Sequence, residues 1–106
     1  MPKFLIVGSY TQEGIKGVLK EGGSGRTEAV RKLVTGVGGS VESFYFALGK
    51  DDFYVTVDLP DNISAAAIGM TIAAAGSVSS RTVALLTPAE IDEATHRKVD
   101  YRAPGA

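Results

Sequence analysis

A glycine-rich segment beside an arginine carries groups that can bind an anion. The sequence EGGSGRT, from Glu21 to Thr27, places Gly22, Gly23 and Gly25 just before Arg26. Free backbone amides at the start of a helix, together with a guanidinium, bind phosphate or carboxylate groups. The segment lacks the lysine and the spacing of a P-loop. It is either an anion site made of these four residues or, as the sequence favours, a simple break between two helices.

Three tyrosines form a second candidate site. Tyr10, Tyr45 and Tyr54 are placed to line a pocket between a sheet and its helices, where Lys16 or Arg26 would orient an anionic ligand. A pocket of this kind can bind a small ligand without catalysis, or it can serve a cofactor-independent enzyme. The alternative is aromatic packing at a subunit interface, where tyrosine is enriched.

The remaining polar residues make no complete metal or acid–base site. His96 is the one histidine of the chain, and it follows Asp92 and Glu93 by about one helical turn. Two or three ligands on one terminal helix leave a metal site incomplete, so we expect a solvated helix face there. Asp51 and Asp52 lie in a turn, where aspartate is favoured for backbone hydrogen bonding rather than for catalysis. We therefore expect no metal and no cofactor.

Composition narrows the class of protein. With 106 residues, 44% of them hydrophobic, we expect one domain over residues 1–106, of which 96–106 form a loosely ordered tail. A formal charge of -1 argues against nucleic acid as a partner. The absence of cysteine fits a reducing compartment, and the short apolar run at the start does not predict a signal peptide, so we expect a cytoplasmic protein. The uncharged stretch 62–80 is too rich in serine, glycine and alanine for a membrane span.

Hydrophobic patterns and capping residues predict the elements that hold these side chains. Thr11 and Asp61 are suited to cap helices, Gly38-Gly39 and Gly76 to end them, and Thr87-Pro88-Ala89-Glu90 to form a capping box. Alternating or continuous apolar residues predict the strands. The expected strands are 3–10, 41–48, 53–59 and 81–87, and the expected helices begin near residues 11, 24, 61 and 88.

This order predicts an α+β fold of the ferredoxin-like βαββαβ type, with a four-stranded antiparallel sheet and a short extra helix at the C-terminus. Both main helices would cover one face of the sheet. The other face would expose Val41, Tyr45, Ala47 and Tyr54. Because exposed apolar patches of this kind mark interfaces, we expect self-association through the open face, most simply as a homodimer.

Several segments together resemble the GYD domain family, a group of small bacterial proteins of uncharacterised function. The segments are SYT, KEGG, FYFALG, VDLPDN and LLTPAEIDEA, and the resemblance extends over almost the whole chain. It implies a fold of the dimeric α+β barrel type. In the segment that names the family, Gly49 and Asp52 are present but Asp51 stands where tyrosine is expected. A role that rests on that tyrosine does not carry over.

The sequence therefore supports a cytoplasmic, homo-oligomeric module that binds a small ligand or serves assembly alone. The alternative is a cofactor-independent oxygenase or isomerase that acts on a small organic substrate in the cavity between sheet and helices. Burial distinguishes them: an enzyme needs an enclosed cavity with a titratable group pointing inward, whereas an assembly module needs its tyrosines at the surface that meets a neighbour.

Overall fold

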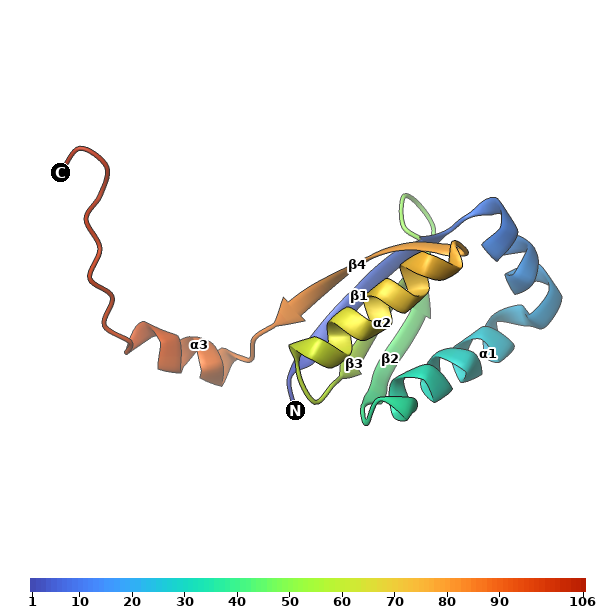
Figure 1. Ribbon diagram of the computed structural model, residues 1–106, viewed down its shortest axis with the longest axis horizontal. Helices are drawn as coiled ribbons and strands as arrows, with labels where there is room; N and C mark the ends of the chain where they lie inside the picture. The colour runs from blue at the N-terminus through green and yellow to red at the C-terminus, as the bar shows by residue number, and fades with distance from the viewer.

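The computed structural model describes all 106 residues and contains one four-stranded sheet and three helices. The strands lie in the order β2-β3-β1-β4, and every neighbouring pair is antiparallel. This is the predicted ferredoxin-like α+β arrangement. The elements are β1 (Lys3–Tyr10), α1 (Gln12–Gly36), β2 (Ser40–Phe46), β3 (Phe53–Asp58), α2 (Asn62–Ala75), β4 (Val78–Leu85) and α3 (Pro88–Thr95) (Figure 1).

The predicted capping residues begin the three helices. The Thr11 hydroxyl accepts a hydrogen bond from the Gly14 amide at 3.2 Å. The Asp61 carboxylate accepts one from the Ser64 amide at 2.8 Å, and this bond lowers the pKa of Asp61. Thr87 and Glu90 form the predicted capping box, with bonds of 2.8 and 3.1 Å. Each cap satisfies backbone donors that the first helical turn leaves free.

Glycine bends α1 at the predicted break. Gly22 has a φ of 76° and a ψ of 172° within the helix, so the two expected helices form one element with a kink. The helix resumes after this residue and ends at Gly36, just before Gly38-Gly39. The kink turns the second half of α1 back along the sheet, where Val34 is buried (Figure 1).

The hydrophobic core lies between one face of the sheet and the two long helices. Side chains from β1, β3, β4, α1 and α2, together with Leu59 just after β3, form one buried cluster. Burial of each large aliphatic or aromatic side chain stabilises the fold by about 1.5 to 3 kcal/mol. The cluster consists of Phe4, Ile6, Val34, Phe53, Val55, Val57, Leu59, Ala65, Ile68 and Val78.

A β-bulge places Val41 on the opposite face of the sheet from the one that the sequence predicted. The register between β2 and β3 shifts between Val41 and Ser43, because Glu42 is an extra residue there. Val41 therefore lies opposite Val57 and packs against the core, and the prediction that it faces outward was wrong. Ser43 faces outward and donates a hydrogen bond to the Thr56 hydroxyl at 3.0 Å.

The fourth strand begins earlier than the sequence indicated. β4 starts at Val78 rather than at Arg81, and it pairs with β1 from Tyr10 back to Lys3. Its first residues include Ser79 and Ser80, which are exposed on this edge strand. A strand that is open to solvent needs few apolar residues, so the hydrophobic pattern did not reveal its start.

The face of the sheet away from the helices has no covering element. Tyr45 and Tyr54 are cross-strand partners there, and they are 71% and 40% exposed. Val7 is only 1% exposed because Tyr54 and Arg81 flank it on the neighbouring strands. Tyr45 and Tyr54 therefore lie on the open face as expected, and they form an aromatic row on edge strand β2 and the neighbouring β3.

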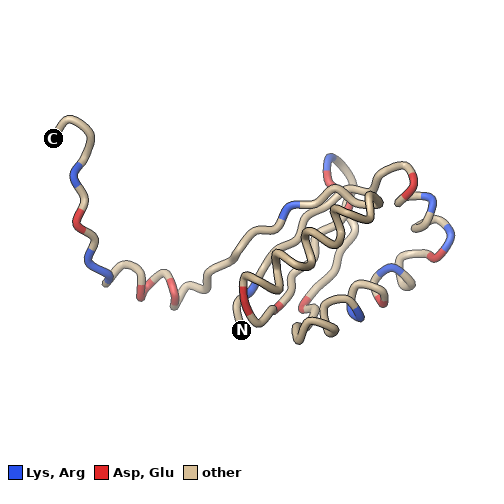
Figure 2. The backbone as a smooth tube through the Cα atoms, viewed as in Figure 1, with Lys and Arg blue, Asp and Glu red and all other residues tan.

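The helices differ sharply in charge. Figure 2 shows charged residues along α1, whereas α2 carries none between Asn62 and Ala75. No helix combines the length and the apolar character that crossing a membrane requires. Beyond β4, α3 and the C-terminal segment extend away from the sheet, and every residue from Leu86 to Ala106 is exposed (Figure 1).

Candidate functional site

An apolar cavity with one charged residue lies between the sheet and the two long helices. Eleven of its twelve lining residues are hydrophobic, and the twelfth is Arg26. The enclosed space is about 30 Å³, which is room for little more than one water molecule. The lining residues are Ile6, Tyr10, Arg26, Val30, Leu33, Val34, Phe44, Phe53, Val55, Ile68, Ile72 and Val78.

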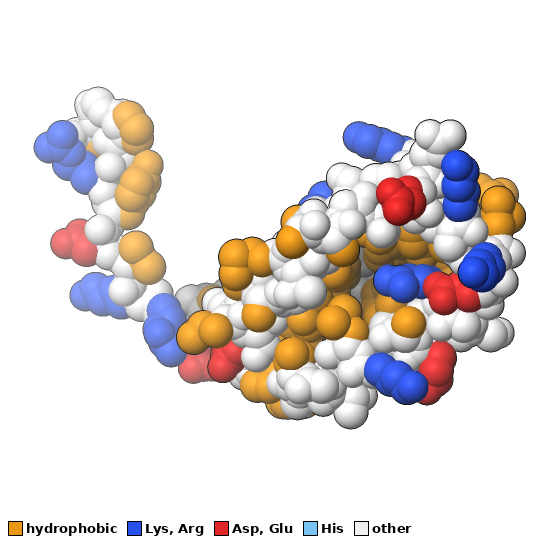
Figure 3. All heavy atoms as spheres, turned by 45° about the vertical axis from the view of Figure 1, so that its right-hand side comes forward, with side chains coloured by type: hydrophobic (Ala, Val, Ile, Leu, Met, Phe, Trp, Pro, Cys, Tyr) orange, Lys and Arg blue, Asp and Glu red, His pale blue; other side chains and the backbone are white.

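Two wider openings adjoin this cavity and share lining residues with it. A groove of about 310 Å³ lies between α1 and α2, and we call it the inter-helix groove. A cleft of about 220 Å³ lies where β1 meets the start of α1, beside Tyr10 and Gly14. Arg26 lines the cavity, the groove and the cleft. Figure 3 shows this hollow, lined by hydrophobic side chains and bordered by charged ones.

The charge of Arg26 has one weak partner. Its guanidinium lies 3.8 Å from the Glu21 carboxylate, which is longer than a hydrogen bond, and the side chain is 32% exposed. An arginine offers five N–H donors in a planar fork that matches a carboxylate. Most of these donors remain free to bind a ligand at the mouth of an apolar cavity.

Tyr10 supplies a hydroxyl beside Arg26. Burial raises the pKa of this phenol above its ordinary value, and the positive charge of Arg26 opposes the shift. The ring packs against Phe53 with the centroids 5.3 Å apart. The phenol is therefore held protonated at neutral pH, as a hydrogen-bond donor next to a cation.

Asp52 holds Tyr10 in place, a role that the sequence did not predict. The Asp52 carboxylate accepts a hydrogen bond from the Tyr10 backbone amide at 2.8 Å, and the Asp52 amide donates to the Gly8 carbonyl at 2.8 Å. These bonds fasten the turn between β2 and β3 to the end of β1. Local backbone bonding was expected for Asp52, but its partner lies 42 residues away.

Replacing Asp52 by alanine is expected to lower the free energy of unfolding by about 1.5 to 3 kcal/mol, because the half-buried Tyr10 amide loses a charged acceptor. Urea denaturation of the variant and the wild type measures the difference. Asparagine at this position keeps an acceptor oxygen and should lose clearly less. Equal losses for Asp52→Ala and Asp52→Asn would show that this hydrogen bond does not stabilise the turn.

Asp51, at the position that departs from the family pattern, faces the open side of the sheet. Its carboxylate lies 3.5 Å from the Tyr54 hydroxyl and 4.0 Å from the Arg81 guanidinium. It thus belongs to the aromatic row of the open face and not to the cavity. Lys50 lies in the same turn, and its carbonyl accepts a bond from the Ser9 hydroxyl at 3.2 Å.

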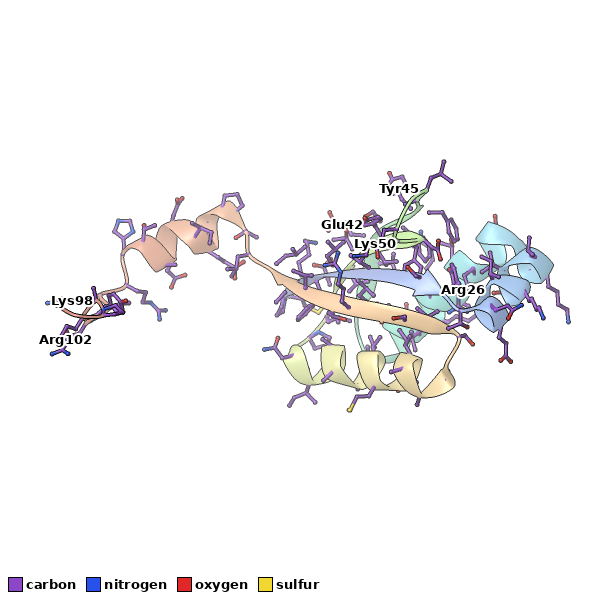
Figure 4. All side chains as sticks on the ribbon, turned by 90° about the horizontal axis from the view of Figure 1, so that it is seen from above. Arg26, Glu42, Tyr45, Lys50, Lys98 and Arg102 are labelled. Atoms are coloured by element: carbon purple, nitrogen blue, oxygen red, sulfur yellow. The ribbon has the colours of Figure 1, made fainter.

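The structure separates the predicted ligand residues into two groups. Tyr10 and Arg26 line the cavity together. Tyr45 and Tyr54 lie on the opposite face, and Figure 4 shows Tyr45 on the side of the sheet away from α2. Lys16 is exposed on α1 and lines none of these openings.

The glycine-rich segment contributes only its arginine to the cavity. Gly22, Gly23 and Gly25 line no cavity, and Gly22 forms the kink of α1. Gly23 packs close to the ring of Phe46. The main role of these glycines is to bend the helix so that Arg26 reaches the inter-helix groove.

The polar residues of α3 bond to the two residues that follow the helix. A ring nitrogen of His96 lies 2.7 Å from the Asp92 carbonyl, and Arg97 pairs with Glu93 at 3.3 Å. No group of three or more histidine, aspartate or glutamate side chains lies close enough together to hold a metal ion.

A family model matches most of the chain. The model of the family described as GYD domain matches residues 4–95, from β1 to the last residue of α3. No curated protein matches the chain.

Proposed function

The chain belongs to the GYD domain family, and we propose that it is a self-associating module that binds a small, largely apolar carboxylate at Arg26. One observation carries this proposal. Arg26 is the only charged residue in a lining of twelve, and its single ionic contact is 3.8 Å long. A cation with free donors beside an apolar cavity matches a ligand that has one anionic end and an apolar body.

The two parts of such a ligand have separate places. Its carboxylate would accept hydrogen bonds from the Arg26 guanidinium and from the Tyr10 hydroxyl. Its apolar body would lie in the inter-helix groove, among Val30, Leu33 and Ile72. The groove volume of about 310 Å³ is at the lower end of the range for small-molecule sites, which favours a compact ligand.

The state of Tyr10 supports binding rather than catalysis. A cofactor-independent oxygenase or isomerase needs a base whose pKa lies near the working pH. Burial raises the pKa of the Tyr10 phenol above its ordinary value, so the proton stays on the oxygen at neutral pH. The phenol then donates a hydrogen bond to a bound carboxylate and does not abstract a proton.

The open face supports self-association. Tyr45 and Tyr54 present exposed aromatic surface there, of the kind found at protein interfaces. One end of the face carries Lys3, which pairs with Glu42 and Asp58, for a sum of +1 -1 -1 = -1. The end beside the turn between β2 and β3 has Lys50, Arg81 and Asp51 around the aromatic row, for a sum of +1 +1 -1 = +1.

These charges favour one orientation of a second copy. Two sheets that face each other across a two-fold axis perpendicular to their strands bring opposite ends together. The negative end of one copy then meets the positive end of the other, which complements the charges at both ends.

Calorimetric titration with octanoate, octanol and octylamine tests the ligand proposal, because the three compounds share one carbon chain and differ in the polar end. Octanoate is expected to bind at least about tenfold more tightly than octanol, since a charge-assisted hydrogen bond contributes about 1.5 to 3 kcal/mol. Octylamine is expected not to bind, because its ammonium would face Arg26. Equal affinity for octanol and octanoate, or no binding of octanoate, would contradict the proposal.

A further inference from the structure

Helix α3 is well formed but has no surface to pack on within its own chain. Its capping box and its proline at the first turn favour the helix. It has only 8 residues, however, and isolated helices shorter than about 12 to 15 residues are marginal in water. All its residues are exposed, and it lies along the 58 Å long axis of the molecule, away from the sheet (Figure 1).

This helix belongs to the domain that the family shares. The family match includes α3 and ends at its last residue, Thr95. A helix of the shared domain needs tertiary packing to be stable, since propensity alone does not maintain so short a helix. Its apolar side chains include Ile91 and Ala94, which are three residues apart and so lie on one side of the helix.

The outer face of α2 is a matching apolar surface without a partner. Surface helices normally carry charged residues on the side that faces water, but α2 has none. Ile63 is 78% exposed and Met70 is 69% exposed. The exposed residues between them are Ala66 and Ala67, whose small side chains let another helix approach closely. The exposed residues of this outer face are Ile63, Ala66, Ala67, Met70, Ala73 and Ala74.

A short linker keeps α3 from its own α2. Only Leu86 and Thr87 connect β4 to α3, and two residues span at most about 7 Å. The outer face of α2 is the side that is turned away from the sheet. To reach it from the end of β4, the linker would have to pass the full width of α2, which is about 10 to 12 Å with its side chains. The acceptor surface must therefore belong to another molecule.

We propose that α3 of one copy packs, through Ile91 and Ala94, on the outer face of α2 of a second copy, and that the second copy returns the same contact. Such an exchange is closed and symmetric, because each chain offers one helix and one acceptor face. It buries the two apolar surfaces that the isolated chain leaves exposed. It uses a different surface from the open sheet face and does not depend on the ligand site.

Cysteine cross-linking tests this exchange, because the natural sequence has no cysteine. Full-length chains with Ile91→Cys are mixed with chains that carry one of four substitutions on α2. These second chains carry a tag, so that the mixed pair has its own mass. The four substitutions are Ile63→Cys, Ala67→Cys, Met70→Cys and Ala74→Cys. The mixtures are oxidised, and intact mass spectrometry measures the disulfide-linked mixed pair. A tagged chain with Arg31→Cys, at an exposed position on α1, is the control.

At least one α2 position is expected to give about tenfold more mixed pair than Arg31→Cys. Yields no higher than this control at all four positions would overturn the exchange. A chain that carries both Ile91→Cys and Ala67→Cys gives a second test. Disulfide-linked dimers are expected from it, whereas an internal disulfide in monomers would show that α3 folds back on its own α2 and would overturn the proposal.

Discussion

Replacing Arg26 by leucine is expected to weaken octanoate binding by about 100-fold, because the ligand then loses its only cationic partner. Hydrogen bonds to charged groups contribute about 1.5 to 3 kcal/mol, and a bidentate pair lies at the upper end of this range. Leucine has a similar apolar stem, so the hydrophobic part of the groove is retained. Calorimetric titration measures the loss, and binding of octanol should change little.

Two further variants separate the shape of the guanidinium from its charge. Arg26→Lys keeps the charge but cannot form the planar two-bond contact, so we expect an intermediate loss of about tenfold. Arg31→Leu removes a cation from an exposed position of the same helix that lines no cavity, and it should bind octanoate as the wild type does. An equal loss in Arg31→Leu would mean that only the net charge of the protein matters.

Replacing Tyr45 by aspartate is expected to halve the mass of the oligomer in solution. Tyr45 is 71% exposed on the open face, where a second copy would cover it. An uncompensated carboxylate at the centre of an interface costs about 3 to 5 kcal/mol, which raises the dissociation constant by at least about 100-fold. Light scattering at a fixed protein concentration measures the mass.

A matched surface variant controls for the added charge. Leu19→Asp places the same carboxylate at an exposed position on α1, outside the open face, and should leave the mass unchanged. Circular dichroism of both variants checks that the fold is retained. An unchanged mass for Tyr45→Asp would place the contact between subunits elsewhere.

The fold was largely predictable because its signals are local. Capping by Thr11, Asp61 and Thr87 depends on side chains within three residues of the amides that they bind. The kink at Gly22 and the end of α2 at Gly76 require positive φ, which glycine adopts without strain. These interactions can be identified without knowledge of the rest of the molecule.

The predictions from the sequence were wrong or incomplete where contacts between distant strands decide the position of a residue. The bulge at Glu42 reverses the direction of Val41, and only the register against β3 reveals it. The start of β4 at Val78 depends in the same way on pairing with Tyr10. The bond between Asp52 and Tyr10 joins residues that are far apart in sequence, so no spacing indicated it.

The candidate site was predictable in part. Tyr10 and Arg26 were both expected to face a ligand, and the fold brings them to one cavity. Tyr45 and Tyr54 were expected there too, but Phe44 and Phe53 face the helices, so the residues next to them along each strand face the other way. The inter-helix groove arises from the packing of α1 against α2, which no local pattern describes.

Native mass spectrometry of the protein isolated from the cells that naturally produce it tests the central claim most directly, because it reports subunit number and retained small molecules together. We predict an oligomer with an even number of subunits, each with an added mass that corresponds to a small organic acid. The same preparation of Arg26→Leu should lack this mass. Subunits without any added mass, or the same added mass in both proteins, would contradict the proposed function.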